Sequence, residues 1–283
     1  MAGPVLHSVH IHPLKAARAL DREAVLVERW GLAGDRRWML VDPDGKLITQ
    51  REEPRLALLT AAPRADGSLV LSAPGAEPLA VTVPEPVATV PVRVFRTKVE
   101  AVLAAESAST WCGAYLGRPV RLVHLDDPAV RRPIDPAYAR PGETVSFADG
   151  YPLLLATTAS LDALNSLISQ GDLPDEGPVP MSRFRPNLVI EGTEPWAEDG
   201  WWRIRVGEVL FRVPKPCSRC IVTTTDQLSA RRGKEPLRSL ARHRRSPGNG
   251  ALFGTNLIPE SSGTVRVGDA LTVLERATPP VFA

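Results

Sequence analysis

Cysteine is scarce in this sequence, and its scarcity limits the chemistry that the chain can support. Three cysteines occur among 283 residues, too few for the disulfide framework of a small secreted protein. No stretch approaches the roughly 18 consecutive apolar residues of a membrane helix, and the N-terminus lacks a basic region followed by an apolar one. We therefore expect a protein of the reducing cytoplasm, without a membrane span or a secretory signal.

Strong charge is lacking as well. The formal net charge of +2 is too mild to indicate a nucleic-acid partner. The chain also lacks a Gly-x-Ser-x-Gly elbow, a P-loop, and a Gly-x-Gly-x-x-Gly motif after a strand, which disfavours the common hydrolase and nucleotide-binding folds. Basic residues do cluster at 231–234 and 242–245. These clusters suit either a solvated surface or a docking patch for an acidic partner.

Proline and glycine punctuate the chain throughout, with 28 and 21 copies. The apolar runs between them are short and rich in β-branched residues, which predicts strands. We expect a mainly β (α+β) fold: a β-barrel-like domain at 1–125, then a second β-barrel domain at 126–283 with a few helices. The boundary is placed in the proline- and charge-rich segment 126–143. One helix should begin at Thr158, capped by Thr157 or Thr158.

Two of the three cysteines, Cys217 and Cys220, lie three residues apart with Arg219 between them. The following run, 221–225, is rich in β-branched residues and predicts a strand. Cys220 would then lie where a loop enters a strand, from which its side chain can face a ligand. A thiol near fixed positive charge loses its proton more easily, and the thiolate is the form that attacks or binds metal.

The Cys-x-x-Cys pattern has two common interpretations, and neither fits well. A structural zinc site needs four nitrogen or sulfur ligands, but only Cys112 and scattered histidines remain to complete it. A thioredoxin-like redox pair lies at the N-terminus of a helix, whereas the run after Cys220 favours a strand.

Several cationic or amide side chains occur at predicted turn–strand junctions: Lys15, Arg37, Arg185, Asn187 and Arg219. The planar fork of arginine suits phosphate oxygens, and backbone amides at turns help to bind anions. Taken singly, each could equally be a surface residue. Spacing alone does not show that they converge.

Seven segments carry a resemblance to a known family. Those at 184–190, 217–226, 252–254 and 263–269 resemble the signature of the MOSC family, and those at 11–15, 34–41 and 48–51 resemble the MOSC N-terminal β-barrel domain. The resemblance covers nearly the whole chain, and its separated motifs occur in the right order. The branch with the greatest resemblance is that of the mitochondrial amidoxime-reducing component and its bacterial relatives.

The resemblance implies a molybdopterin form of the molybdenum cofactor, with the metal held by Cys220. We expect no iron–sulfur cluster in this chain, because such a cluster needs about four cysteines and the sequence has three. The cofactor contacts implied are Lys15, Ala16, Arg37, Gly150, Tyr151, Arg185, Asn187, Ser218, Arg219 and Asn256. The chain departs from the animal enzymes at Ala16 and Asn256, where those carry serine and tyrosine, which puts side-chain contacts there in doubt.

The activity implied is the reduction of N-hydroxylated compounds such as amidoximes, hydroxylamines or N-hydroxylated bases. Electrons would come from a separate flavin, haem or iron–sulfur protein, and the enzyme would act as a monomer. Asp35 and Asp226 are candidate catalytic residues that relay protons or orient ligands, with a structural role as the alternative for each. Two other functions stay open: a sulfur carrier with a persulfide on Cys220, and a binding module whose cysteine is incidental.

Overall fold

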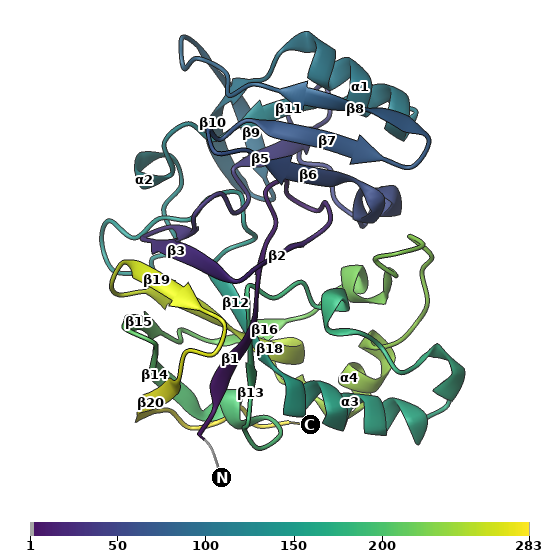
Figure 1. The fold of residues 1–283 in the computed structure, drawn as a ribbon. Coiled ribbons are helices and arrows are strands. Elements are labelled where there is room, and N and C mark those ends of the chain that lie inside the picture. Colours follow the sequence, from purple (N-terminus) through teal and green to yellow (C-terminus); the bar gives the residue numbers. More distant parts are fainter. Residues whose placement is uncertain (1–2, 283) are drawn as a thin grey trace.

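Strands dominate the computed structural model, which describes residues 3–282. Two lobes lie one above the other, with strands β5 to β11 and helix α1 in the upper lobe (Figure 1). The lower lobe contains a ten-stranded sheet whose central order is β2-β1-β13-β12-β18-β15-β14-β20. The prediction of a mainly β fold with a few helices is confirmed. Within the described residues, no helix is both long enough and apolar enough to cross a membrane.

The upper lobe contains two antiparallel sheets and a helix, packed around two apolar cores. The sheets run in the orders β5-β11-β10-β9 and β6-β7-β8. Helix α1 buries Cys112 and Leu116 in the core that it shares with the three-stranded sheet, and β9 and β10 contribute to the other core. The elements are β5 (Trp38–Val41), η1 (Pro54–Leu58), β6 (Thr60–Pro63), β7 (Leu69–Ala73), β8 (Ala76–Val81), β9 (Thr89–Val94), β10 (Thr97–Leu103), α1 (Glu106–Leu116) and β11 (Arg121–His124).

The lower lobe is built mostly from the second half of the chain, and its large sheet is antiparallel except where β12 meets β13. Helix α2 (Pro128–Arg131) lies beside the upper lobe in Figure 1. The elements of the lower lobe from this half are β12 (Leu153–Thr157), α3 (Thr158–Ser169), η2 (Pro174–Glu176), η3 (Met181–Arg183), β13 (Leu188–Glu191), η4 (Ala197–Gly200), β14 (Trp201–Val206), β15 (Val209–Arg212), β16 (Pro216–Ser218), η5 (Ile221–Thr224), α4 (Leu237–His243), β17 (Arg245–Ser246), β18 (Gly250–Pro259), β19 (Gly263–Arg266) and β20 (Leu271–Arg276).

The first strands of the chain also belong to the lower lobe. They are β1 (Val5–Ile11), β2 (Leu20–Arg22), β3 (Ala24–Glu28) and β4 (Gly31–Leu32). Strand β1 pairs with β13, and β3 pairs with β19 near the C-terminus. The chain thus begins in the lower lobe, builds the upper lobe and returns. The division into 1–125 and 126–283 stays a prediction, and these pairings join the start of its first part to its second.

Two segments that cross between the lobes are hydrogen-bonded to each other. The backbone N–H of Lys15 donates to the Trp38 carbonyl at 2.8 Å, and that of Arg36 donates to the His12 carbonyl at 2.8 Å. Buried Asp35 reinforces the junction by accepting from the backbone N–H of His12 at 2.7 Å. These contacts fix the positions of the side chains that point from the crossing segments toward the space between the lobes.

Helix α3 begins at Thr158, as predicted, and the buried carboxyl group of Glu198 is hydrogen-bonded to its N-terminal residues. The Thr157 hydroxyl accepts from the Ser160 backbone N–H at 3.1 Å. Glu198 is only 1% exposed; its Oε2 accepts from the hydroxyls of Thr157 and Ser160 at 3.2 and 2.9 Å. Its Oε1 has no partner among the described residues. Burial raises the pKa of Glu198 to about 7, because the charged form loses its hydration.

Glu198→Gln should therefore remove the free-energy cost of ionising a buried carboxyl group, which grows with pH. Because the pKa is raised from 4.5 to about 7, the wild-type protein should lose stability as the pH rises across this window. The variant should be more stable than the wild type at about pH 8, by a free energy of unfolding on the order of 2 kcal/mol. Urea unfolding at both ends of the window measures this. Exposed Glu194→Gln is the control, and parallel pH profiles for wild type and Glu198→Gln would contradict the assignment.

Candidate functional site

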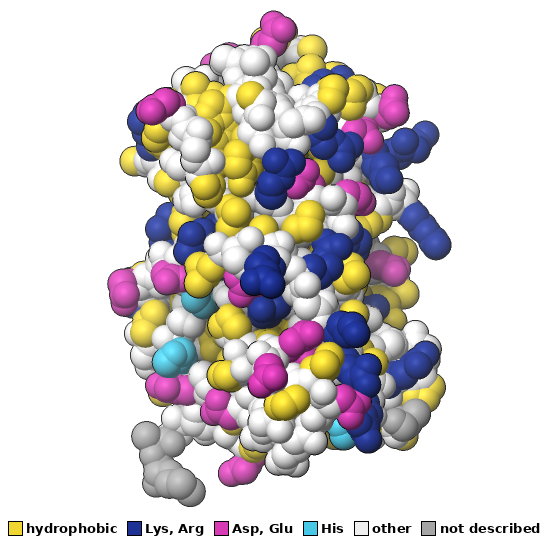
Figure 2. Space-filling model, turned by 90° about the vertical axis from the view of Figure 1, so that its right-hand side faces the viewer, with side chains coloured by type: hydrophobic (Ala, Val, Ile, Leu, Met, Phe, Trp, Pro, Cys, Tyr) yellow, Lys and Arg dark blue, Asp and Glu magenta, His cyan; other side chains and the backbone are white. Residues whose placement is uncertain are grey.

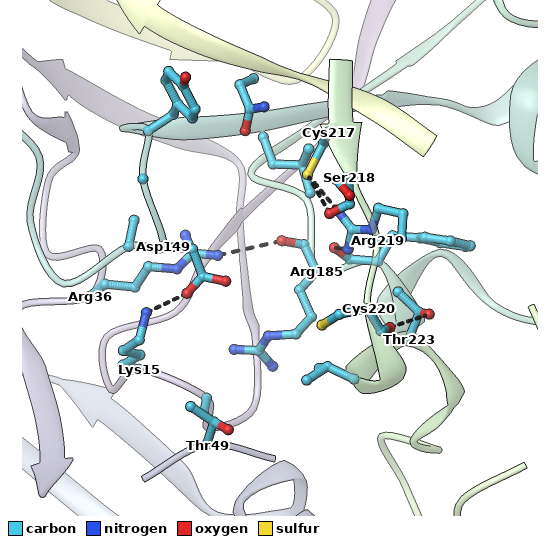
Figure 3. A pocket seen from close by; sticks show the side chains of 18 of the residues that line it. Lys15, Arg36, Thr49, Asp149, Arg185, Cys217, Ser218, Arg219, Cys220 and Thr223 are labelled. Carbon is cyan, nitrogen blue, oxygen red and sulfur yellow. Dashed lines mark hydrogen bonds and ion pairs between the residues drawn. The ribbon is translucent and has the colours of Figure 1, made fainter. Parts of the chain in front are cut away.

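A pocket opens between the two lobes and is lined by loops from both (Figure 3). Of the sequence-predicted residues, nearly all line it, together with others that the sequence did not indicate. The lining includes Lys15, Ala16, Arg36, Thr49, Gln50, Arg51, Asp149, Gly150, Tyr151, Arg185, Asn187, Cys217, Ser218, Arg219, Cys220, Thr223 and Asn256. The structure thus brings Lys15, near the start of the chain, into the same pocket as Asn256, near its end.

Cys220 lies between strand β16 and the short 3-10 helix η5. The prediction of a strand at 221–225 was wrong. The hydroxyls of Thr223 and Thr224 each donate at 2.9 Å to the carbonyl three residues earlier. Such local side-chain bonds compete with a strand ladder, so the β-branched run forms a tight turn. The turn leaves the half-buried Cys220 thiol at the pocket wall.

The thiols of Cys217 and Cys220 each accept a hydrogen bond from a different arginine. Arg51 Nη2 donates to Cys220 Sγ at 3.2 Å, and Arg219 Nη1 donates to Cys217 Sγ at 3.0 Å. The cysteines form no disulfide, and Arg219 lies between their side chains in Figure 3. Arg51 lies in the segment 48–51 that resembles the MOSC N-terminal domain, but the sequence predicted no role for it. Arg51 belongs to the upper lobe and Cys220 to the lower lobe, so this hydrogen bond crosses between the lobes.

Lys15 is buried at the pocket, with 4% of its surface exposed. Its Nζ donates to the Phe147 carbonyl at 2.6 Å and to Asp149 Oδ1 at 2.5 Å. Burial lowers the pKa of Lys15 to about 8, although Asp149 opposes the shift. The ammonium is therefore held in the pocket at a cost in hydration that a bound anion would reduce.

Two arginines reach the pocket through left-handed backbone conformations. Arg36 has a φ of 47° and Arg185 a φ of 56°. Arg36 Nη1 donates to Asp35 and, at 3.1 Å, to Asn187 Oδ1. Arg185 Nη1 donates to Gln227 Oε1 at 3.2 Å. Burial and then the nearby Arg36 lower the pKa of Arg185. Bulky residues in this conformation are rare and mark functional sites.

The sequence prediction chose the wrong member of the Arg36–Arg37 pair for the pocket. Arg37 turns away from it: Nε and Nη2 donate to the Leu125 carbonyl at 2.9 and 2.6 Å, and Nη2 also donates to the Asp126 carbonyl at 3.0 Å. These bonds anchor the crossing segment to the end of β11. Because Arg36 has a left-handed backbone with a φ of 47°, its side chain turns into the pocket and takes the place expected of Arg37.

The two predicted carboxylates do not line the pocket either. Asp226 Oδ1 accepts from the backbone N–H groups of Leu228 and Ser229 at 3.1 and 2.8 Å, and Oδ2 lies 3.2 Å from Arg183. Asp226 therefore holds a surface turn, and Asp35 holds the junction between the lobes. The structure shows neither at a position from which it contacts a ligand in the pocket.

Asp149 is the carboxylate that does line the pocket, next to the turn at Gly150 and Tyr151. Its side chain is 71% exposed, because the pocket is open to water. Surrounding protein atoms disfavour its charge, but Lys15 and the guanidinium groups outweigh this and hold its pKa well below the usual range. Asp149 therefore stays ionised and orients Lys15.

Positive charge exceeds negative charge in this pocket. Five cations line it, namely Lys15, Arg36, Arg51, Arg185 and Arg219, and their carboxylate contacts among the described residues are Asp35 and Asp149. The buried Nε of Arg219 has no partner in that part of the chain. Excess buried cations suit an anion with several oxygens, such as phosphate.

The donor set also fits a metal held by one thiolate. Within residues 3–282, no three histidine, cysteine or acidic side chains converge as a ligand group. A soft thiol ligand beside a surface with excess positive charge suits a metal that arrives within a phosphorylated organic cofactor. The residues present therefore fit a molybdopterin cofactor, with Cys220 as the candidate ligand.

The excess charge predicts pH-dependent anion binding. A bound anion favours the charged form of Lys15, so the affinity for sulfate should fall as the pH rises through about 8. Isothermal titration calorimetry on metal-free protein measures this, and sulfate does not change its own charge in this range. Lys15→Met should bind more weakly and lose the step. A flat profile for the wild type, or an unchanged step in Lys15→Met, would refute the assignment.

Comparisons with known proteins identify the family of this chain. The model of the MOSC N-terminal beta barrel domain matches residues 3–119, and that of the MOSC domain matches residues 142–272. The chain is 32% identical to mitochondrial amidoxime-reducing component 1 of Homo sapiens, over 93% of this chain and 81% of that protein. It is 33% identical to the Mus musculus protein of the same name, over 93% and 80%.

A second kind of relative shares the same region. Molybdenum cofactor sulfurase of Oryza sativa subsp. japonica is 31% identical over 88% of this chain, but the match covers only 32% of that protein. The resemblance inferred from the sequence motifs is confirmed. The chain belongs to the family of MOSC-domain proteins with a MOSC N-terminal β-barrel domain, to which the mitochondrial amidoxime-reducing components also belong.

Proposed function

We propose that this protein is a molybdenum-cofactor-dependent reductase of N-hydroxylated compounds. The observation that carries the proposal is the half-buried thiol of Cys220 at the wall of a pocket with excess positive charge. The similarity to amidoxime-reducing components over most of both chains supports the same reaction class. Substrates would be amidoximes, hydroxylamines or N-hydroxylated bases, and the enzyme would act as a monomer.

Residues from both lobes would hold the cofactor. Lys15, Arg36 and Arg185 would bind its phosphate, because their charges are buried and only partly balanced. Asn187 fixes Arg36 by accepting at 3.1 Å, and its Nδ2 donates to the His10 carbonyl at 3.1 Å. Ser218, Arg219 and the turn at Gly150 and Tyr151 would contact the pterin. Asn256 donates to the Lys215 and Pro216 carbonyls, at 3.2 and 3.3 Å, and would position the loop before Cys217.

The chemistry divides between the cofactor and the chain. When bound, the molybdenum cofactor would supply two electrons for cleavage of the nitrogen–oxygen bond, which also consumes two protons and releases the oxygen as water. The Arg51 guanidinium stabilises negative charge on Cys220 Sγ and fixes the direction of the sulfur. Asp149 holds the Lys15 ammonium in place. We propose that Asp149, rather than Asp35 or Asp226, orders water in the pocket, because it is the acid that lines it.

Electrons would come from a separate flavin, haem or iron–sulfur protein. The exposed cations of the basic segments, Arg231, Lys234 and Arg242, could attract an acidic donor. Arg232 Nη2 donates to the Gln50 carbonyl at 2.5 Å, which places this segment beside the pocket. Arg244 does not belong to such a surface, since it is buried and ion-paired with Asp199. A cytoplasmic location remains our prediction.

Elemental analysis tests the proposal. Protein purified from a host that makes molybdenum cofactor should contain about one molybdenum per chain, since one thiolate holds the metal. Cys220→Ala should lose it, and Cys217→Ala, the matched control, should retain it. The loaded wild type should reduce an amidoxime with a chemical electron donor. Loss of metal in both variants would contradict the separate roles of the two cysteines.

The same samples test the alternative of a sulfur carrier. The similarity to molybdenum cofactor sulfurase and the accessibility of Cys220 favour this alternative. Protein without molybdenum but with cyanide-labile sulfur, lost in Cys220→Ala, would replace the reductase with the carrier. Protein with neither signal would leave a binding module.

A further inference from the structure

An aromatic side chain of the upper lobe lies next to two residues of the pocket lining and has a strained backbone conformation. Phe95 occupies the first position of the two-residue turn that joins β9 to β10, closed by the pair Val94–Thr97. Its φ is 55°. Hairpin turns favour glycine, asparagine or aspartate at such positions, and a bulky residue there is an outlier. The β9–β10 turn therefore contains Phe95 at a position where the backbone conformation favours a small residue.

Packing within the lobe does not account for this ring. Its neighbours Val92 and Val94 are buried in the apolar core, at 1% and 0% exposed, whereas Phe95 is 43% exposed. An exposed aromatic side chain contributes less to folding than a buried one. Strained residues of this kind concentrate at functional sites.

The ring contacts two residues that line the pocket. Its centroid lies 5.1 Å from Arg51 Cζ and 5.6 Å from Lys15 Nζ, both within cation–π range. Arg51 in turn donates to Cys220 Sγ at 3.2 Å. A single guanidinium therefore separates the exposed ring from the thiol. A molecule whose reacting group lies at Cys220 extends toward Phe95 if it leaves the pocket on the side of the upper lobe.

We propose that Phe95 determines substrate specificity by contacting the aromatic substituent of an N-hydroxylated substrate. This inference rests on the proposed function and extends it to a substrate class: aryl amidoximes and N-hydroxylated bases over small aliphatic ones. Aromatic rings stack on one another in offset or edge-to-face arrangements, and planar bases stack on aromatic side chains. The adjacent cations hold the Phe95 ring in place, and its exposed part is available to a second ring.

A pair of substrates with the same reacting group tests the proposal. Benzamidoxime and acetamidoxime differ in the ring, and Phe95→Gly removes the side chain while suiting the turn. The ratio of kcat/KM for benzamidoxime to that for acetamidoxime should fall roughly tenfold in Phe95→Gly, through KM, as expected for loss of one aromatic contact. Phe95→Tyr should retain the ratio. Val87→Gly, which removes another exposed apolar side chain of the same lobe, is the matched control.

Two results would overturn the proposal. One is an unchanged ratio in Phe95→Gly. The other is an equal loss for both substrates, which would mean that the ring acts only by positioning Arg51 or Lys15. If the loaded wild type reduces neither compound, the proposed function fails, and calorimetric binding of benzamide, a planar compound without an N–O bond, then decides the role of Phe95. Weaker benzamide binding in Phe95→Gly would support it, and equal binding would refute it.

Discussion

Positive charge buried between two lobes is the constraint on which this structure depends. Lys15, Arg36 and Arg185 lose hydration in the pocket, and the carboxylates of Asp35 and Asp149 offset this cost only in part. Uncompensated buried cations are unfavourable in a protein without a ligand. The crossing segments, the left-handed backbone of Arg36 and Arg185, and the side-chain amide of Asn187 hold these cations in fixed positions. This arrangement indicates that the pocket suits an anion.

The two lobes have separate tasks around that charge. The lower lobe supplies the thiol of Cys220 on a tight turn, and the crossing segments supply Lys15 and Arg36. The upper lobe adds Arg51, the donor to the sulfur, and Phe95, which contacts Arg51. A MOSC domain alone would therefore contain the proposed metal ligand but not this contact. Lys15 follows β1 and precedes β2, both of which belong to the large sheet of the lower lobe, so the site depends on both lobes.

The sequence was sufficient for the β-rich class and for most of the pocket. Family motifs identified segments that the structure brings together, among them Lys15, Arg185, Asn187 and Cys220. Residue types alone could not separate Arg36 from Arg37, because a backbone φ of 47° decides which one turns inward. The β-branched residues after Cys220 predicted a strand, but the threonine hydroxyls donate to nearby carbonyls and favour a tight turn instead. Asp149 and Phe95 are fixed by tertiary contacts that leave no local pattern.

The most direct test of the central claim is a crystal structure of the protein isolated with its cofactor, using the anomalous scattering of molybdenum. The account predicts an anomalous peak bonded to Cys220 Sγ and phosphate density beside Lys15, Arg36 and Arg185. A peak bonded to Cys217, or a persulfide on Cys220 in place of the metal, would contradict it.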